Sequence, residues 1–277
     1  MLVLMGSIAN VNAQVVAYYT FDGNANDQSV NNNNATVDGN YSFVPNGLAG
    51  EESLRINGDN SLFYSGGGYV NLPQFSASLN SGFTVSLWAN DVSIGSNPVG
   101  EEDFVSFGIL DSAQTGIAIN NNNPASPILE YYMDTGLGGP QHLDRVEIDI
   151  PITNLSAFEN SWQNLAMTYT PGQFSAYLNG TLVGQGNIVF NGFPVSEAAL
   201  GSHWWSDGQS ARMSATLNNV AIFDQGLTAD QIDTLYANDG SPIPEPSAYT
   251  TISGMAALVF VVIRRKRTPN KVGPLLH

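Results

Sequence analysis

Residues 162–183 read WQNLAMTYTPGQFSAYLNGTLV, and this stretch decides the fold class. Two runs rich in apolar and aromatic residues flank Pro171-Gly172, a pair that is typical of a turn between two strands. Asn179-Gly180 then turns the chain before a third run, and Asn-Gly is a strong signal for a two-residue hairpin. The stretch therefore predicts three consecutive antiparallel strands.

Similar strand patterns recur along the chain, separated by turn-forming residues. Residues 83–88 read FTVSLW and alternate large apolar with small polar side chains, as a half-buried strand requires. Further strands are expected at 15–21, 69–72, 104–110, 128–132, 145–150 and 217–223. Thr228 and Gln231 form a capping box for the one helix that we expect. The pattern predicts an all-β jelly-roll sandwich of two antiparallel sheets with one short helix near its end.

The charge distribution separates the body from its C-terminal tail. The chain has 277 residues with 8 basic and 24 acidic side chains. Before residue 264 the only basic side chains are Arg55, Arg145 and Arg212, so the body is strongly acidic. Such a body repels the phosphates of nucleic acid, and we expect no nucleic-acid partner. Cysteine is absent, so the fold depends on its own core.

The N-terminus predicts export. An apolar stretch from Leu2 to Ile8 leads to Val11-Asn12-Ala13 and then to polar Gln14. Small residues before a polar start are typical of a signal-peptidase site, although no positive residues precede the apolar stretch. We expect residues 1–13 to be a partial signal peptide; the alternative is an early first strand.

The C-terminus predicts a membrane segment. Residues 241–247 form a proline-rich linker that contains Pro244-Glu245-Pro246. Residues 248–263 carry no charge and predict a transmembrane helix. The tail, residues 264–277, opens with Arg264-Arg265, and a basic cluster of this kind is expected on the cytoplasmic side.

The order Pro-Glu-Pro, apolar helix, arginine-rich end resembles the PEP-CTERM sorting signal of Gram-negative bacteria. That resemblance implies an exosortase as a processing partner and the membrane as a transient anchor. It implies an exported protein of the cell surface, the outer membrane or an extracellular matrix. The alternative is a plain C-terminal membrane anchor.

Residues 14–240 resemble a bacterial laminin-G-like, concanavalin A-like domain. The pieces that carry the resemblance occur in the family order: 19–27 (YTFDGNAND), 68–73 (GYVNLP), 83–88 (FTVSLW), 162–169 (WQNLAMTY), 177–183 (YLNGTLV), 218–224 (NNVAIFD) and 227–232 (LTADQI). The resemblance implies a concanavalin A-like sandwich. It does not select one function, because this fold carries lectins, adhesins and enzymes.

Calcium is the cofactor that we expect. Calcium prefers carboxylate and amide oxygens on loops, which are abundant in this chain. Members of the family commonly hold one calcium ion at the edge of the sandwich, and the resemblance implies Asp22 and Asn219 as ligands. Asn57 could add a further oxygen. The alternative for Asp22 is an Asx-turn.

Aromatic residues near polar loops predict sugar binding. Trp and Tyr rings can stack on a sugar ring while neighbouring amides bind its hydroxyls. Trp204 and Trp205 lie between strand signals beside polar residues, and Tyr131, next to Tyr132, is a further candidate. The alternative for these rings is ordinary packing at the rim of the sandwich.

Glu147 and Asp149 raise the alternative of a glycoside hydrolase. Alternation along a strand puts both carboxylates on one face, as in the Glu-x-Asp-x-(x)-Glu motif of family-16 endoglucanases. The third carboxylate of that motif is replaced by Pro151 or Ile152. A retaining hydrolase needs a nucleophile and a separate acid/base. The second Glu of the motif, expected at 151 or 152, is absent, so we expect no enzyme.

The sequence thus favours an exported binding module, carbohydrate-binding or adhesive, whose partner is an extracellular glycan or exopolysaccharide. Two alternatives stay open: a divergent family-16-like hydrolase and a purely structural matrix protein.

Overall fold

Antiparallel strands make up most of the regular structure in the computed structural model, which describes residues 13–45, 47–58, 67–74, 79–93, 101–108, 113–123, 125–135, 145–190, 197–205, 208–210 and 213–242. The strands are β1 (Val15–Tyr19), β2 (Thr36–Asp38), β3 (Tyr41–Val44), β4 (Ser53–Ile56), β5 (Tyr69–Asn71), β6 (Phe83–Ser93), β7 (Glu101–Gly108), β8 (Gln114–Asn120), β9 (Ile128–Asp134), β10 (Val146–Pro151), β11 (Gln163–Thr170), β12 (Gly172–Leu178), β13 (Thr181–Ile188), β14 (Ala198–Leu200), β15 (His203–Trp205), β16 (Gly208–Ser210) and β17 (Ser214–Phe223). The helices are a 3₁₀ turn (Leu48–Gly50), α2 (Leu155–Asn160) and α3 (Ala229–Ala237).

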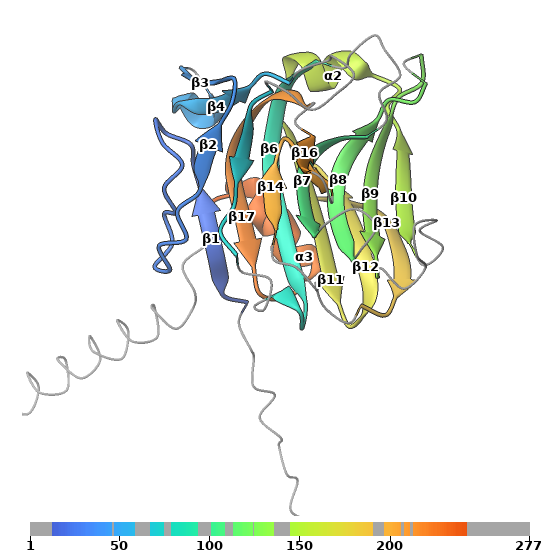
Figure 1. Ribbon diagram of the computed structural model, residues 1–277. Coiled ribbons are helices and arrows are strands. Elements are labelled where there is room, and N and C mark those ends of the chain that lie inside the picture. Colours follow the sequence, from blue (N-terminus) through green and yellow to red (C-terminus); the bar gives the residue numbers. More distant parts are fainter. Residues whose placement is uncertain are drawn as a thin grey trace, which may run out of the picture. The chain divides into compact units, whose positions relative to one another are not determined.

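The strands in the described residues form two large sheets (Figure 1). The eight-stranded sheet has the order β13-β12-β11-β6-β17-β4-β3, and β1 also pairs with β17. The seven-stranded sheet has the order β10-β9-β8-β7-β14-β5-β2, and β15 and β16 form a separate hairpin. All pairings between named strands are antiparallel, so the expected all-β sandwich of two antiparallel sheets is confirmed.

The two turns that decided the fold class form as predicted. Thr170 pairs with Gln173 across the first turn, and Leu178 pairs with Thr181 across the second. Asn179 and Gly180 both have positive φ, 50° and 74°, which is the conformation of a type I′ hairpin. The sequence Asn-Gly suits this turn because both residues tolerate the left-handed region.

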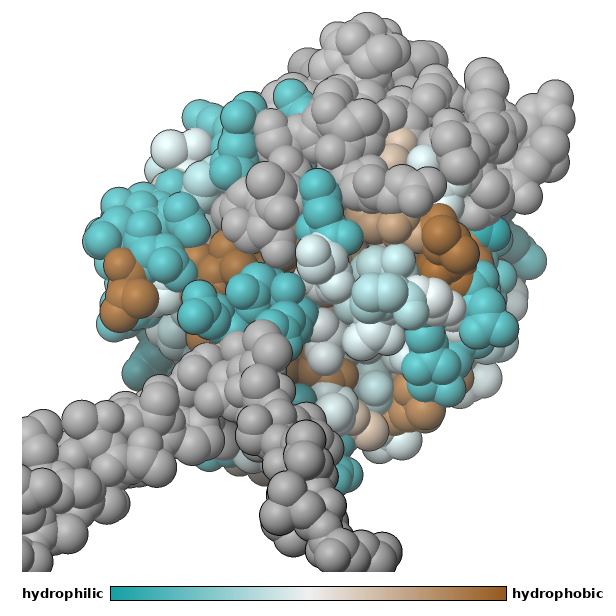
Figure 2. Space-filling view, turned by 90° about the horizontal axis from the view of Figure 1, so that it is seen from below, coloured by the Kyte–Doolittle hydropathy of each residue, from teal (hydrophilic) through white to brown (hydrophobic). Residues whose placement is uncertain are grey.

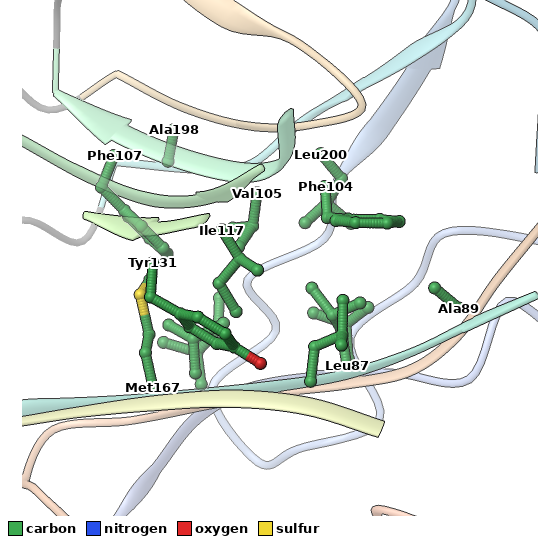
Figure 3. Close-up of a cluster of buried hydrophobic side chains, with 14 of the residues drawn as sticks. Leu87, Ala89, Phe104, Val105, Phe107, Ile117, Tyr131, Met167, Ala198 and Leu200 are labelled. Carbon is green, nitrogen blue, oxygen red and sulfur yellow. The ribbon is translucent and has the colours of Figure 1, made fainter. Parts of the chain in front are cut away.

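The core lies between the two sheets, because alternate residues of each strand face inward. Leu87 of β6 and Met167 of β11 meet Val105, Ile117 and Tyr131 of the facing sheet (Figure 3). These side chains are buried, and each buried large apolar side chain contributes roughly 1.5–3 kcal/mol to stability. The period of two that gives this core also places every intervening residue on the outside of a sheet.

Helix α3 covers part of the outer face of the eight-stranded sheet. Its buried residues Ile232 and Leu235 belong to a second apolar cluster with Phe223 of β17. The ring of Tyr236 stacks on Trp88 of β6, with ring centroids 5.4 Å apart and 16° between planes. The predicted capping box is confirmed, since Thr228 and Gln231 exchange both hydrogen bonds.

Both ends of the described body lie on this side of the sandwich. Ala13 and Val15 at the start pack against the cluster under α3. At the other end, α3 is followed closely by Pro242, the last described residue. Seen from the end opposite α2, apolar residues on the coloured surface form separate patches among polar ones (Figure 2).

Some expectations differ from the structure or lie outside it. A second helix, α2, was not predicted, and neither were the strands β2, β3, β4, β8, β14, β15 and β16. The C-terminal region from residue 243 on lies outside the described residues, and so do residues 1–12 of the expected signal peptide. This places Pro244, Glu245, Pro246, the segment 248–263 and the basic tail outside them. No helix in the described part is long and apolar enough to cross a membrane.

The two sheets approach closely where the edge strands β10 and β13 meet. A Cβ added to Gly184 would lie 2.3 Å from Cγ2 of Ile148, and one added to Gly186 would lie 2.2 Å from Cγ1 of Val146. Real Cβ atoms do not come this close to other atoms. The two glycines therefore allow β10 to pack directly on β13 and close this side of the core.

We expect Gly186→Val to lower the free energy of unfolding by about 1–3 kcal/mol, because the new side chain overpacks this contact. The matched control is Asn187→Val, which adds a similar side chain at the neighbouring exposed position of β13. Urea unfolding followed by tryptophan fluorescence measures both. Equal stability of the two variants would contradict the close approach of the sheets.

Buried tyrosines give the stability a pH dependence in the alkaline range. Burial raises the pKa of the Tyr131 hydroxyl above its ordinary value of 10.0. Burial also raises the pKa of Tyr19, and the negative charge of Asp27 adds to this. The unfolded chain therefore ionises first, so this stabilisation is complete below about pH 10 and is lost as pH rises above it.

We expect the free energy of unfolding to fall between pH 9 and pH 11, and Tyr131→Phe to remove part of the fall. Urea unfolding at a series of pH values measures this dependence. Tyr41→Phe, on the exposed edge strand β3, is the control. A pH dependence that is identical in the wild type and in Tyr131→Phe would show that Tyr131 is not buried.

Candidate functional site

The outer face of the seven-stranded sheet is polar, although most of its side chains are buried. In β9, Leu129, Tyr131 and Met133 join the core, so Glu130, Tyr132 and Asp134 lie on the opposite face. The strand register extends this outer face over β7, β8, β10 and β14. We define the outer face by Asp103, Ser106, Gly108, Gln114, Gly116, Ala118, Glu130, Tyr132, Asp134, Glu147, Asp149, Glu197 and Ala199.

Tyr132 lies across β8 to reach β7. Its hydroxyl donates to Oδ1 of Asp103 at 2.6 Å. The ring passes over Gly116, where a Cβ would lie 2.5 Å from the tyrosine oxygen. Gly116 is therefore needed for the position of this ring, and Ala118, the next residue of β8 on this face, is also small.

Arg145 holds the β9 and β10 side of the outer face together. Its guanidinium forms ion pairs with Glu130 and, at 2.8 Å, with Glu147. It also lies 4.2 Å from the ring centroid of Tyr132, which is a cation–π contact. Glu130 accepts a further hydrogen bond from Nδ2 of Asn120 at 3.0 Å. The result is a buried charge network, with Glu147 48% exposed at its margin.

A row of small residues crosses the middle of the outer face. Ala199, Ser106 and Gly116 are register neighbours on β14, β7 and β8. Asn71 ends the row on one side and Tyr132 on the other. These residues are small and buried, and the side chain of Tyr132 lies over Gly116 at one end of the row.

The β15–β16 hairpin lies beside this row. The hydroxyl of Ser106 donates to the backbone oxygen of Ser202 at 2.8 Å, just before β15 begins. The strand β15 contacts both β7 and β14. The structure therefore brings the backbone of Trp204 and Trp205 next to the outer face. Their side chains lie outside the described part, so their sugar-binding role stays a prediction.

In the described part of the outer face, two buried polar atoms have no hydrogen-bond partner. They are Nε2 of Gln114, a residue only 3% exposed, and Oε2 of Glu197. Gln114 is the register neighbour of Gly108, whose backbone N–H donates to the backbone oxygen of Glu197. One glycine, with no side chain, thus separates an unused donor from an unused acceptor. Buried polar groups without a hydrogen-bond partner are rare, because each lowers the stability of the fold by about 1–3 kcal/mol.

Two other unpartnered atoms lie on the opposite side of the sandwich. They are Nε1 of Trp88 and Oδ1 of Asn218, which are register neighbours on β6 and β17. Tyr236 of α3 stacks on Trp88. The ring of Trp88 is therefore covered by a helix of the fold.

Tyr131 is not a ligand-binding residue, and that prediction was wrong. Its side chain is 0% exposed, and its hydroxyl donates to the backbone oxygen of Tyr177 on the facing sheet at 2.6 Å. Alternation in β9 puts it on the core side with Leu129 and Met133. Its neighbour Tyr132 is the tyrosine of the outer face.

Two of the three predicted calcium ligands, Asp22 and Asn57, lie far apart. Oδ1 of Asp22 accepts from the backbone N–H of Glu52, which precedes β4, whereas Asn57 follows the other end of β4, about 16 Å away. The amide of Asn219 is engaged elsewhere, accepting from Tyr18 and donating to Asp239. Among the described residues there is no cluster of three acidic or histidine side chains that could hold a metal. Calcium binding stays a prediction, but Asp22 and Asn57 are too far apart to bind the same ion.

Glu147 and Asp149 lie on one face of β10, as alternation predicted. Asp149 is the register neighbour of Glu130, so a third carboxylate does stand beside the pair. Glu130 is buried and bound to Arg145 and Asn120, which leaves it engaged by the protein's own donors. Gln114, Glu130 and Glu197 were not predicted; the period of two in ILEYYMD, residues 128–134, was the signal for Glu130.

Solved structures share the fold at low sequence identity. The binding domain of botulinum neurotoxin DC in complex with rat synaptotagmin II matches with a TM-score of 0.60 and 15% identity, covering 81% of this chain and 51% of that one. The same domain in complex with SialylT matches with a TM-score of 0.60 and 14% identity, covering 81% of this chain and 51% of that one. The chain thus spans about half the length of these neurotoxin domains.

A third similar structure is domain 4 of AbnA, a GH43 extracellular arabinanase from Geobacillus stearothermophilus, in complex with arabinotriose. It has a TM-score of 0.54 and 20% identity, and the match covers 81% of this chain and 98% of that one. A search of curated proteins gives no match.

The family comparison assigns residues 64–233 to Laminin_G_3, described as the concanavalin A-like lectin/glucanases superfamily. This match covers more than half of the chain and includes β5 to β17 and the first part of α3. The chain therefore belongs to the concanavalin A-like lectin/glucanases superfamily.

Proposed function

We propose that this chain is an exported glycan-binding module that holds its ligand on the outer face of the seven-stranded sheet. The residues beyond Gly240 serve as its sorting and anchoring tail. The ligand is an oligosaccharide or exopolysaccharide of the cell surface or matrix, and the module binds it without cleaving it.

The unpartnered pair Gln114 and Glu197 carries this proposal. Nε2 of Gln114 can only donate a hydrogen bond, and Oε2 of Glu197, as a carboxylate oxygen, can accept one. A hydroxyl can both donate and accept, so a hydroxyl of a ligand can satisfy either group. Sugars present many hydroxyls on a rigid ring, and a ligand of this kind removes the cost of two unmet hydrogen bonds.

The charge of the outer face limits the choice of glycan. Glu147 and Asp149 are exposed on β10 and can accept hydrogen bonds from sugar hydroxyls. In the described part of the face Arg145 is the one basic side chain, and it is already paired with Glu130 and Glu147. We therefore expect neutral glycans to bind and anionic ones, such as uronic acid polymers, to be disfavoured.

The attachment of the body supports a surface role. Its first described residue and α3 both lie on the outer face of the eight-stranded sheet, which is the opposite side of the sandwich. The proposed glycan face therefore lies on the other side of the sandwich from α3. This arrangement suits a module that presents a binding face to its surroundings.

Fold relatives support glycan binding in general terms. One similar domain was determined with arabinotriose and another with SialylT. A third belongs to botulinum neurotoxin type C, whose cell entry depends on interaction with two ganglioside molecules. The proposal of catalysis is less well supported, because Glu130 and Glu147 share one arginine and Pro151 stands where the hydrolase motif has a carboxylate.

We expect Gln114→Leu to weaken glycan binding by about tenfold, which corresponds to the loss of one hydrogen bond of about 1.4 kcal/mol. The same change should leave the free energy of unfolding unchanged or raise it, because it removes an unsatisfied buried amide. A glycan array of the purified chain identifies the ligand, and calorimetry then measures the affinity. No new reducing ends should appear during the assay.

The matched control is Asp233→Asn on the exposed side of α3, which should leave affinity unchanged. Two outcomes speak against the proposal. Either no neutral glycan binds at all, or Gln114→Leu loses stability and retains full affinity.

A further inference from the structure

A pocket of about 170 Å³ lies at one end of the sandwich, under α2. It opens between the edge of the seven-stranded sheet and the strands β11 and β12 of the other sheet. Its wall is mainly apolar and is formed by Leu129, Ile150, Ile152, Ala157, Phe158 and Leu178. Figure 1 shows α2 above this end of the strands.

The size of the pocket decides what can enter it. Sites for whole drug-sized ligands have volumes of about 300–1,000 Å³, so this pocket is too small for an entire oligosaccharide. An apolar cavity of about 150 Å³ lined by Leu, Ile and Phe accepts a group as large as benzene. The pocket therefore has room for one small apolar group.

Polar residues stand at the mouth of the pocket. Thr153 and Asn154 are exposed and line it together with Gln163. The amide of Gln163 is already engaged with Ala157, Ser161 and Asn179, so it closes the wall. The oxygen of Asn154 accepts from Ser156 at 2.7 Å, and its Nδ2 keeps donor capacity at the rim. An apolar interior with amide and hydroxyl groups at the rim suits a methyl group joined to an amide.

The strand β10 connects this pocket with the proposed glycan face. Asp149 lies on the outer face, and Pro151, two residues further along the same face of the strand, lines the pocket. Two residues of a strand span about 7 Å, which is comparable to one sugar unit. A glycan that passes Asp149 can therefore reach the mouth of the pocket with its next substituent.

We propose that this pocket takes the acetamido group of an N-acetylated hexosamine, so that the preferred glycan is N-acetylated. The methyl group enters the apolar interior, while the amide stays at the rim near Thr153 and Asn154. This inference rests on the proposed glycan binding and adds the identity of the sugar. Electrostatic attraction alone would favour the deacetylated sugar, because Glu147 and Asp149 attract its cationic amine.

Three oligosaccharides of equal length separate these cases: chitotetraose, its fully deacetylated form and cellotetraose. Calorimetry with the full-length chain at pH 7 should show chitotetraose binding about five times more tightly than cellotetraose, as expected for one buried methyl group. Ala157→Leu fills the pocket from α2 and should remove this preference while cellotetraose affinity stays the same. Glu159→Leu, at an exposed position of α2 that does not line the pocket, is the matched control and should retain the preference.

The outcomes distinguish the two proposals. If all three sugars bind without preference for the N-acetylated one, or if the preference survives Ala157→Leu, the pocket assignment is wrong and glycan binding stands. Tighter binding of the deacetylated oligosaccharide also overturns the pocket assignment, because charge would then determine the choice. If no oligosaccharide binds, both proposals fail.

Discussion

The packing of two sheets through their inner faces is the constraint on which the rest of this structure depends. Without cysteine, the body relies on this apolar contact for its stability. Alternation along each strand then assigns every second residue to an outer face, whether or not that residue serves the core. The polar groups of β7 to β10 share one surface because Tyr131, Ile117 and Val105 must share the other.

One arginine organises much of that outer surface. Arg145 contacts two carboxylates and the ring of Tyr132, and the ring in turn reaches Asp103. A buried network of this kind contributes little net stability against an apolar alternative, but it fixes the orientation of each member. Such fixed donors and acceptors bind a ligand at a low entropic cost, because they need little rearrangement.

The sequence was sufficient for the parts of the fold that depend on local chemistry. Asn179-Gly180 encodes its turn through the positive φ that both residues tolerate, and Thr228 with Gln231 encodes the start of α3. The long strand β6 exceeds its predicted end at Trp88, because residues 89–93 are held by pairing with β17 and β11. This pairing involves segments that are distant in the chain, so no local sequence pattern predicts it.

The candidate site was less predictable, for two physical reasons. Tyr131 was assigned to the surface because adjacent aromatics were read together, although the alternation in β9 separates Tyr131 from Tyr132. Gln114 and Glu197 are 83 positions apart in the chain, and only the pairing of β7 with β8 and β14 brings them to either side of Gly108. No sequence pattern predicts which buried polar side chain will lack a hydrogen-bond partner in the folded chain.

The side-chain amide of Gln114 gives the most direct test that the outer face of the seven-stranded sheet binds the ligand. Its Nε2 protons can be followed by ¹⁵N-resolved NMR while a bound oligosaccharide is titrated into the chain. If the outer face binds the ligand, these protons shift strongly and exchange more slowly with solvent, and the indole signal of Trp88 on the other sheet stays unchanged. A shift at Trp88 with the Gln114 amide unaffected would contradict binding at this face.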